Sequence, residues 1–246
     1  MRLFGLIGYP LSHSFSKKYF TEKFTRENIS GCRYELFPLE NIEQFPELIK
    51  TQTNLAGLNV TIPYKQLVIP YLDELDQAAA AVGAVNTISD INGKLKGYNS
   101  DVYGFELSLR NLLATKKKRP DKALILGTGG AAKAVNFVLK KLNIEAKTVS
   151  RSSDKGNFTY TDLNDKIIGE HLLIINTTPL GMSPNFNNLP LIPYPSVGPE
   201  HFLFDLVYNP AVTAFLEKGN IAGAATSNGL EMLYLQAEKA WDIWNP

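Results

Sequence analysis

Leu124-Ile125-Leu126-Gly127-Thr128-Gly129-Gly130-Ala131-Ala132 is the stretch that decides the fold class of this 246-residue chain. Its aliphatic residues are typical of a buried strand, its glycines have the spacing G-x-G-x-x-A, and a helical apolar pattern over 131–142 follows. Glycines so placed allow a tight turn and let the N–H groups of a helix N-terminus approach a pyrophosphate. The stretch predicts a dinucleotide site at Gly127, Thr128, Gly129, Gly130 and Ala131, although such glycines also form purely structural turns.

The end of the next predicted strand indicates which dinucleotide binds. Chains that bind NAD usually carry Asp or Glu about 20 residues after the glycines, where it holds the ribose 2′-hydroxyl. Here the strand ends without an acid, and Ser150, Arg151, Ser152 and Lys155 offer hydroxyls and cations that suit a 2′-phosphate. We therefore expect NADP as the cofactor. The alternative is an exposed basic loop, partly neutralised by Asp154.

Short apolar runs alternate with helical patterns along nearly the whole chain, which is typical of α/β folds with mainly parallel strands. We expect strands over 3–7, 33–37, 55–60, 84–89, 94–98, 123–126, 147–150, 172–176 and 202–206. We expect helices over 16–26, 41–50, 73–81, 101–113, 131–142 and 228–244. Asn92-Gly93 predicts a hairpin turn, and the proline-rich segment 178–199 predicts an irregular, functional loop.

Overall charge limits the kind of partner. The chain has 25 Lys+Arg against 24 Asp+Glu, a formal charge of +1, so we expect neither nucleic acid nor a membrane as a partner. The basic segment 115–121 lacks interleaved aromatic residues, and we interpret it as a solvated helix end and linker after which the pattern restarts.

Cysteine and histidine usage indicates the compartment and the metal content. A single cysteine and the lack of a long apolar stretch favour a cytoplasmic protein. We expect no metal, because the 3 histidines show no ligand spacing.

Polar side chains recur where the strands of the first half end. Ser14 and Ser16 follow the first strand, Thr61 and Lys65 the third, and Asn86 a later one, while Asp101 stands at a helix start. Open α/β sheets bind ligands at such strand ends, so this recurrence favours a pocket for a polyhydroxylated small molecule. For the serines the alternative is helix N-capping. Lys65 and Asp101 form a candidate acid/base pair beside a nicotinamide, with a plain salt bridge as the alternative.

Taken together, these motifs resemble the shikimate dehydrogenase family. The matching elements run in order through essentially the whole chain: Gly8 to Ser16, Asn59-Val60-Thr61-x-Pro63-x-Lys65, Gly83-Ala84-Val85-Asn86-Thr87, Asn99-x-Asp101-x-x-Gly104, Leu126 to Ala132, Asn176-x-Thr178-Pro179-x-Gly181-Met182, Asp205-x-x-Tyr208 and Met232-Leu233-x-x-Gln236-Ala237. Their order is far more specific than any single glycine motif.

The resemblance implies a fold and an activity. It implies an N-terminal α/β substrate-binding domain over 1–100, completed by the C-terminal helix 226–246, and a Rossmann NADP-binding domain over 101–225, with the active site in the cleft between them. It also implies the NADPH-dependent reduction of 3-dehydroshikimate to shikimate, on the route to chorismate and the aromatic amino acids, in a monomer or homodimer.

The resemblance also assigns roles. Lys65 would be the acid/base residue, with Asp101 orienting both Lys65 and the substrate. The substrate carboxylate and hydroxyls would be held by Ser14, Ser16, Thr61, Asn86, Asp101 and Gln236, with Tyr208 beside them. Leu206 and Gly229 would line the nicotinamide, Gly127 to Ala131 would carry the pyrophosphate, and 150–155 would hold the 2′-phosphate.

Several positions depart from the family pattern. Lys17 stands where proline is usual, Ser150-Arg151-Ser152 where Asn-Arg-Thr is common, Thr128 where alanine is frequent, and Gln77 where an acid is common. None of these departures removes a residue that the chemistry needs. A quinate/shikimate dehydrogenase that uses either nicotinamide, and a non-catalytic nucleotide-sensing regulator on the same fold, remain as alternatives.

Overall fold

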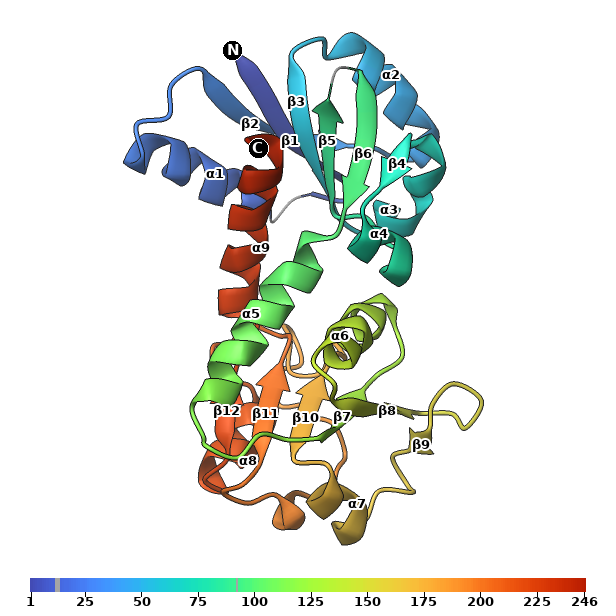
Figure 1. The fold of residues 1–246 in the computed structure, drawn as a ribbon, viewed down its shortest axis with the longest axis vertical. Coiled ribbons are helices and arrows are strands. Elements are labelled where there is room, and N and C mark those ends of the chain that lie inside the picture. Colours follow the sequence, from blue (N-terminus) through green and yellow to red (C-terminus); the bar gives the residue numbers. More distant parts are fainter. Residues whose placement is uncertain (12–13, 92) are drawn as a thin grey trace. The chain divides into compact units, whose positions relative to one another are not determined.

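A computed structural model describes residues 1–11, 14–91 and 93–246 of the chain. The chain divides into two units, one of Met1–Ser100 with Ala237–Pro246 and one of Asp101–Gln236 (Figure 1). The first unit has a mixed sheet and the second a parallel one, each with helices beside it. The α/β class predicted from the sequence is therefore confirmed.

The first unit contains a 6-stranded sheet of order β2-β1-β3-β5-β6-β4. Its strands are β1 (Arg2–Gly8), β2 (Cys32–Pro38), β3 (Leu55–Val60), β4 (Glu74–Leu75), β5 (Thr87–Ile91) and β6 (Lys94–Tyr98). Its helices are α1 (Phe15–Arg26), α2 (Phe45–Thr51), α3 (Tyr64–Leu67) and α4 (Gln77–Val82), with 3-10 turns η1 (Ile42–Gln44) and η2 (Ile69–Tyr71). Strand β1 pairs in parallel with β2 and β3, whereas β5 is antiparallel to β3 and β6. The carboxyl ends of β1 and β3 therefore meet at one edge.

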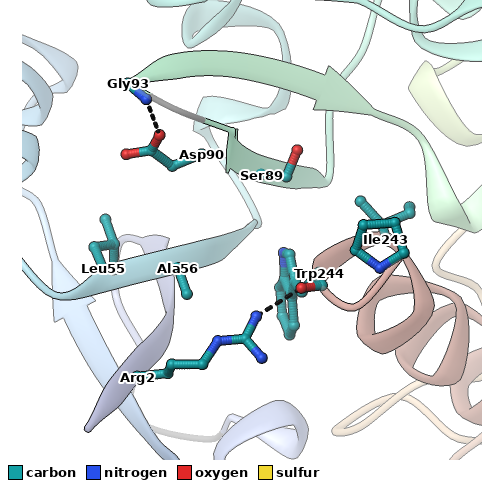
Figure 2. Close-up of a pocket in the computed structure, with 9 residues that line it drawn as sticks. Arg2, Leu55, Ala56, Ser89, Asp90, Gly93, Ile243 and Trp244 are labelled. Atoms are coloured by element: carbon teal, nitrogen blue, oxygen red, sulfur yellow. Dashed lines mark hydrogen bonds between the residues drawn. The ribbon is translucent and has the colours of Figure 1, made fainter.

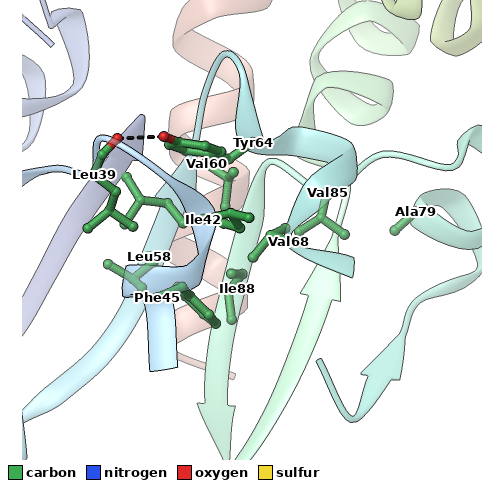
Figure 3. Close-up of a cluster of buried hydrophobic side chains, with 11 residues drawn as sticks. Leu39, Ile42, Phe45, Leu58, Val60, Tyr64, Val68, Ala79, Val85 and Ile88 are labelled. Carbon is green, nitrogen blue, oxygen red and sulfur yellow. Dashed lines mark hydrogen bonds between the residues drawn. The ribbon is translucent and has the colours of Figure 1, made fainter. Parts of the chain in front are cut away.

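Two apolar cores cover the two faces of this sheet, because successive side chains of a strand point to opposite faces. Ile7 packs in the core that also contains Leu58 and Tyr64, on the side of α2 to α4 (Figure 3). Its neighbour Leu6 packs in the other core, with the aromatic residues of α1 and with Trp244. The sheet thus holds α1 and the chain's last residues on one face.

The second unit contains a 6-stranded, entirely parallel sheet of order β12-β11-β10-β7-β8-β9. Its strands are β7 (Lys122–Leu126), β8 (Glu145–Ser150), β9 (Phe158–Thr159), β10 (Leu173–Asn176), β11 (Phe202–Asp205) and β12 (Ala225–Ser227). The remaining helices are α5 (Ser100–Ala114), α6 (Gly130–Lys141), α7 (Asp165–Glu170), α8 (Ala214–Ile221) and α9 (Leu230–Trp244), with a 3-10 turn η3 (Tyr194–Ser196). All parallel strands end at the same edge, so Leu126, Ser150, Asn176 and Asp205 lie there.

The structure corrects several expected elements. The helix expected over 73–81 is wrong in its first half, because Glu74–Leu75 pairs with β6, and Asp76 caps α4 by accepting a hydrogen bond from the N–H of Ala79 at 2.7 Å. The strand expected from residue 84 begins only at Thr87. Helices α3, α7 and α8 and strands β9 and β12 are additional to the expected elements. The predicted hairpin turn includes Asn92, which lies outside the described residues.

The chain passes from the first unit to the second after Ser100 and returns to the first after Gln236. The basic segment 115–121, interpreted above as a linker, lies inside the second unit, where the ammonium of Lys116 donates to the carbonyls of Pro199 and His201. Residues 226–236, expected with the first unit, lie in the second. The reason is that β12 pairs with β11, and that Gly104 lets α5 approach α9 so closely that a Cβ there would lie 2.6 Å from the carbonyl oxygen of Met232. No helix in the described part of the chain has the length and apolar character that a membrane crossing requires.

Candidate active site

The parallel pairing of β1 with β3 places Thr61, the residue after β3, beside the end of β1. The N–H of Thr61 donates to the carbonyl of Ile7 at 2.9 Å, directly before the end of β1. A Cβ on Gly8 would lie only 2.4 Å from Cγ2 of Thr61, so glycine is required where these two strand ends meet. The sequence motifs that contain Gly8 and Thr61 are therefore brought together at this edge of the sheet.

The two predicted serines lie at the start of α1. Ser14 is the N-cap of α1, and its Oγ accepts a hydrogen bond from the N–H of Lys17 at 3.4 Å, which a proline at position 17 has no N–H to make. Ser16 makes a side-chain hydrogen bond with Tyr34, which opposes the rise that burial causes in the pKa of that phenol. The capping role and the predicted substrate role of Ser14 are compatible, because a hydroxyl has two lone pairs and one proton. Ser12 and His13 of the same motif lie outside the described residues.

Asn86 lies in a buried hydrogen-bond network. Its side chain is 3% exposed. Its Oδ1 accepts from the N–H of Ser100 at 2.7 Å, and its Nδ2 donates to Oγ of Ser100 at 3.1 Å. Thr87 contacts both residues, and Asn59 donates to the carbonyl of Asn86 at 3.3 Å. Thr87 and Ser100, which were not among the predicted site residues, thus fix the amide of Asn86 and the start of α5.

Lys65 is carried by α3, a single helical turn that the sequence analysis did not predict. Its carbonyl accepts from the N–H of Val85 at 2.7 Å, and its neighbour Tyr64 is 3% exposed and donates through its hydroxyl to the carbonyl of Leu39 at 2.5 Å (Figure 3). The backbone of Lys65 is therefore tied to the segment before Asn86. Its side chain is half-buried.

The predicted dinucleotide turn has the expected strand–turn–helix context. Gly127 follows β7 with φ +116°, which only glycine adopts readily, and a Cβ there would lie 2.6 Å from Oγ1 of Thr177. Gly129 is the N-cap residue of α6. A Cβ built at Gly129 or Gly130 would meet no atom within 4 Å, so the first turn of α6 is open to a ligand. In this turn, glycine allows the positive φ at position 127, and the N-terminus of α6 has free space beside Gly129 and Gly130.

The segment after β8 has the expected donors on its surface. Ser150 is buried at the strand end, and its Oγ accepts from the N–H of Ser152 at 3.3 Å. Arg151, Ser152 and Lys155 are exposed. The two cations therefore stand in solvent, beside the carboxyl edge of the parallel sheet.

A pocket of about 350 Å³ lies at the ends of β10 and β11. It is lined by Thr177, Thr178, Pro179, Met182, Ser183, Leu206, Val207, Tyr208 and Asn209, so it contains the predicted residues Leu206 and Tyr208. The third predicted residue of this region, Gly229, donates its N–H to the carbonyl of Val207 at 3.2 Å. A Cβ on Gly229 would lie 2.2 Å from the carbonyl oxygen of Leu206, so these two predicted residues are in backbone contact.

A buried pair of polar side chains that the sequence analysis did not list as site residues supports this pocket. Asn176 ends β10 and Asp205 ends β11, and the amide of Asn176 donates to the carboxylate of Asp205 at 2.9 Å. Thr178 donates to Asn176 at 2.6 Å, and Thr213 donates to Asp205 at 2.6 Å. Burial raises the pKa of Asp205 to about 6, although the hydrogen bonds from Thr213, Val207 and Asn176 oppose the rise. The signal in the sequence that could have found this pair is that two predicted strands each carry a polar residue, Asn176 or Asp205, at or near their ends.

Asp101 and Gln236 belong to the second unit, whereas Lys65 belongs to the first. Asp101 lies in the first turn of α5, where the helix dipole favours a carboxylate. Gln236 is 9% exposed on α9 and donates to the carbonyl of Leu233 at 2.9 Å.

A second pocket contains none of the predicted site residues. It has a volume of about 480 Å³ and is lined by Arg2, Leu55, Ala56, Ser89, Asp90, Gly93, Ile243, Trp244 and Pro246 (Figure 2). Arg2 and Leu55 begin β1 and β3, so this pocket lies at the opposite end of those strands from Gly8 and Thr61. The guanidinium of Arg2 donates to the carbonyl of Trp244 at 2.6 Å. Among the described residues, no group of three or more His, Cys, Asp and Glu side chains is placed to hold a metal ion.

A parallel sheet with a glycine turn before a helix, in a chain whose other α/β unit has polar strand ends, is the architecture of a dinucleotide-dependent oxidoreductase. The model of the shikimate dehydrogenase substrate-binding domain matches residues 6–88. A curated NADP-dependent shikimate dehydrogenase from Carboxydothermus hydrogenoformans is 39% identical over 99% of this chain and 91% of the relative. The chain belongs to the shikimate dehydrogenase family, as its motifs predicted.

Solved structures agree with this assignment. Shikimate 5-dehydrogenase from Listeria monocytogenes, in complex with shikimate and NAD, superposes with a TM-score of 0.88 at 29% identity, over 100% of this chain and 92% of that one. The enzyme from Thermus thermophilus, in complex with NADP(H) and shikimate, has a TM-score of 0.84 at 28% identity, over 99% and 93%.

Proposed function

We propose that this chain catalyses the reversible NADPH-dependent reduction of 3-dehydroshikimate to shikimate. The observation that carries the proposal is the match along 99% of the chain to an NADP-dependent shikimate dehydrogenase. The product feeds the route to chorismate and the aromatic amino acids. A cytoplasmic location and a monomeric or homodimeric state remain predictions.

The second unit fits NADP. The open first turn of α6, with free space above Gly129 and Gly130, suits a pyrophosphate, because N–H groups and the helix dipole both favour an anion there. Arg151 and Lys155 would bind the 2′-phosphate by charge-assisted hydrogen bonds, together with Ser150 and Ser152. Leu206 and Gly229, which are in backbone contact, would line the nicotinamide. Thr128 and Ala131 complete the cofactor turn.

The first unit supplies the chemistry on the substrate oxygen. When bound, NADPH would supply the hydride for the C3 carbonyl carbon of 3-dehydroshikimate. Lys65 donates a proton to the carbonyl oxygen as negative charge develops there, and its ammonium stabilises that charge. Asp101 orients Lys65 and binds a neighbouring substrate hydroxyl.

The remaining polar residues hold the substrate. Its carboxylate and hydroxyls would be bound by Ser14, Ser16, Thr61, Asn86 and Gln236, with Tyr208 beside them. The buried network around Asn86 and the capping hydrogen bond of Ser14 lower the entropy that these side chains lose when the substrate binds, because both restrict the side-chain rotamers beforehand.

A steady-state assay with four substrate pairs tests the proposal. Shikimate and quinate are each oxidised with NADP and with NAD, and kcat/KM is compared. We expect shikimate with NADP to be the best pair by at least about tenfold, which corresponds to about 1.4 kcal/mol. Equal rates with quinate and NAD would favour the dual-specificity alternative, which the NAD complex of the Listeria enzyme motivates. Tight NADPH binding without turnover on any pair would favour the regulator.

A further inference from the structure

A cluster of charged side chains links α1 to the last part of α9, two helical segments of the first unit that lie side by side (Figure 1). The side chain of Lys23 is 5% exposed, and its ammonium lies 2.7 Å from a carboxylate oxygen of Glu238 and 3.0 Å from one of Glu27. The hydroxyl of Tyr19 donates to the other oxygen of Glu238. We call Lys23, Glu238 and Tyr19 the clamp.

The clamp lies at the edge of an aromatic core, where Lys23 is buried but the side chain of Glu238 is 42% exposed. Phe20 and Phe24 of α1 pack with Phe4 and Trp241 in the same core. Burial lowers the pKa of Lys23, but its hydrogen bonds with Glu238 and Glu27 outweigh that effect and raise it. An ion pair with a half-exposed carboxylate adds little stability, because water competes for that carboxylate, but its hydrogen bonds still favour one arrangement of the two side chains. The clamp therefore specifies the position of α1 more than it adds stability.

The clamp is linked to the first turn of α1 through an aromatic stack. The ring of Tyr19 stacks on that of Phe15, with centroids 5.4 Å apart and planes 21° from parallel. Phe15 lies between Ser14 and Ser16, the two serines at the start of the helix. Tyr19 therefore connects Glu238 to the residue that lies between the two serines.

We propose that Glu238 is a positioning residue, which holds Ser14 and Ser16 in their substrate-binding arrangement through Tyr19 and Lys23. This inference rests on the proposed function, since it assumes that the serines bind the substrate. The serines are not assigned to the cofactor or to proton transfer. Loss of the clamp should therefore raise KM for shikimate while kcat and KM for NADP change little.

The experiment compares three clamp variants with a matched control. Glu238→Gln keeps the shape but removes the charge, and Tyr19→Phe keeps the stack on Phe15 but removes the hydroxyl. The double variant Lys23→Met with Glu238→Leu replaces both charges of the pair by apolar groups. The control is Lys18→Met with Glu22→Gln, an ion pair of 3.9 Å on the same helix whose side chains are 79% and 61% exposed.

We expect each clamp variant to raise KM for shikimate about tenfold, the scale of one or two lost hydrogen bonds. The control should match the wild type. The double variant should melt close to the wild-type temperature and still show the raised KM. If Glu238→Gln fails to fold, the double variant still tests whether the clamp affects KM for shikimate. A double variant with wild-type stability and wild-type KM would overturn the proposal, as would equal changes in KM for NADP.

Hydrogen–deuterium exchange of the amides at 16–18 separates failure of this inference from failure of the proposed function. Faster exchange there in Glu238→Gln, but not in the control, supports the clamp whatever the wild-type enzyme turns over. Unchanged exchange would overturn it even in an active shikimate dehydrogenase. Wild-type inactivity with shikimate would contradict the proposed function alone.

Discussion

The side-chain amide of Asn176 donates a hydrogen bond of 2.9 Å to the carboxylate of Asp205, and both residues are 0% exposed. The two residues end neighbouring strands, β10 and β11. Directly after them come Thr177, Thr178 and Leu206, which line the 350 Å³ pocket. The bond therefore fixes two walls of the pocket that we assign to the nicotinamide.

Stability should depend on pH through Asp205. Its carboxyl has a pKa of about 6 in the folded chain, against an ordinary value of 3.8. Between these values the folded carboxyl keeps a proton that the unfolded chain has lost. Asp205 therefore contributes its full stabilisation below pH 3.8 and loses it as the pH rises through about 6. The free energy of unfolding should fall by about 3 kcal/mol over this range. Urea denaturation of the wild type and Asp205→Asn at about pH 4 and about pH 7 measures it. Parallel pH profiles for the two proteins would contradict the prediction.

Arg151→Ala should weaken NADP selectively. Loss of a charge-assisted hydrogen bond to the 2′-phosphate should raise KM for NADP by roughly 10- to 100-fold, whereas KM for NAD should stay within about twofold. Arg119→Ala removes another exposed arginine of the same unit and should change neither constant. Equal losses for both cofactors in Arg151→Ala would exclude a phosphate contact.

Lys65→Ala should reduce turnover. A positioned acid or base contributes about 10²- to 10⁴-fold, so kcat should fall on that scale while the affinity for shikimate changes little. Lys50→Ala, which removes an exposed lysine at the end of α2, is the control. Steady-state kinetics and isothermal titration measure the two effects separately. Full turnover in Lys65→Ala would remove this residue from the mechanism.

Gly229→Ala should disturb both the fold and the cofactor pocket. The new Cβ would lie 2.2 Å from the carbonyl oxygen of Leu206, so the backbone must move, at a cost of about 1–3 kcal/mol. We expect a lower Tm and a raised KM for NADP. Gly169→Ala is the matched control, because a Cβ there meets nothing within 4 Å and alanine favours the helix. A Tm for Gly229→Ala equal to that of the control would show that the backbone at Leu206 moves aside without loss of stability.

Local patterns predicted most of the elements because strand and helix periodicity is visible in a short window. The strand over 55–60 has the predicted bounds. The helix expected over 73–81 failed where a contact distant in sequence outweighed local propensity: Leu75 pairs with Gly97 of β6. Likewise, nothing in the sequence around Asn86 indicates that its amide is held by Ser100, 14 residues further on.

By itself, the sequence determined what is local in this protein: the glycine turn at Gly127, where the chain needs a positive φ, and the cations after β8 that indicate NADP. Only the tertiary structure decided which distant residues meet. The carboxylate of Glu238 reaches Lys23 across 215 positions, and Gly229 touches Leu206. Such contacts depend on how whole strands and helices pack. Local patterns in the sequence do not reveal which distant residues this packing brings together.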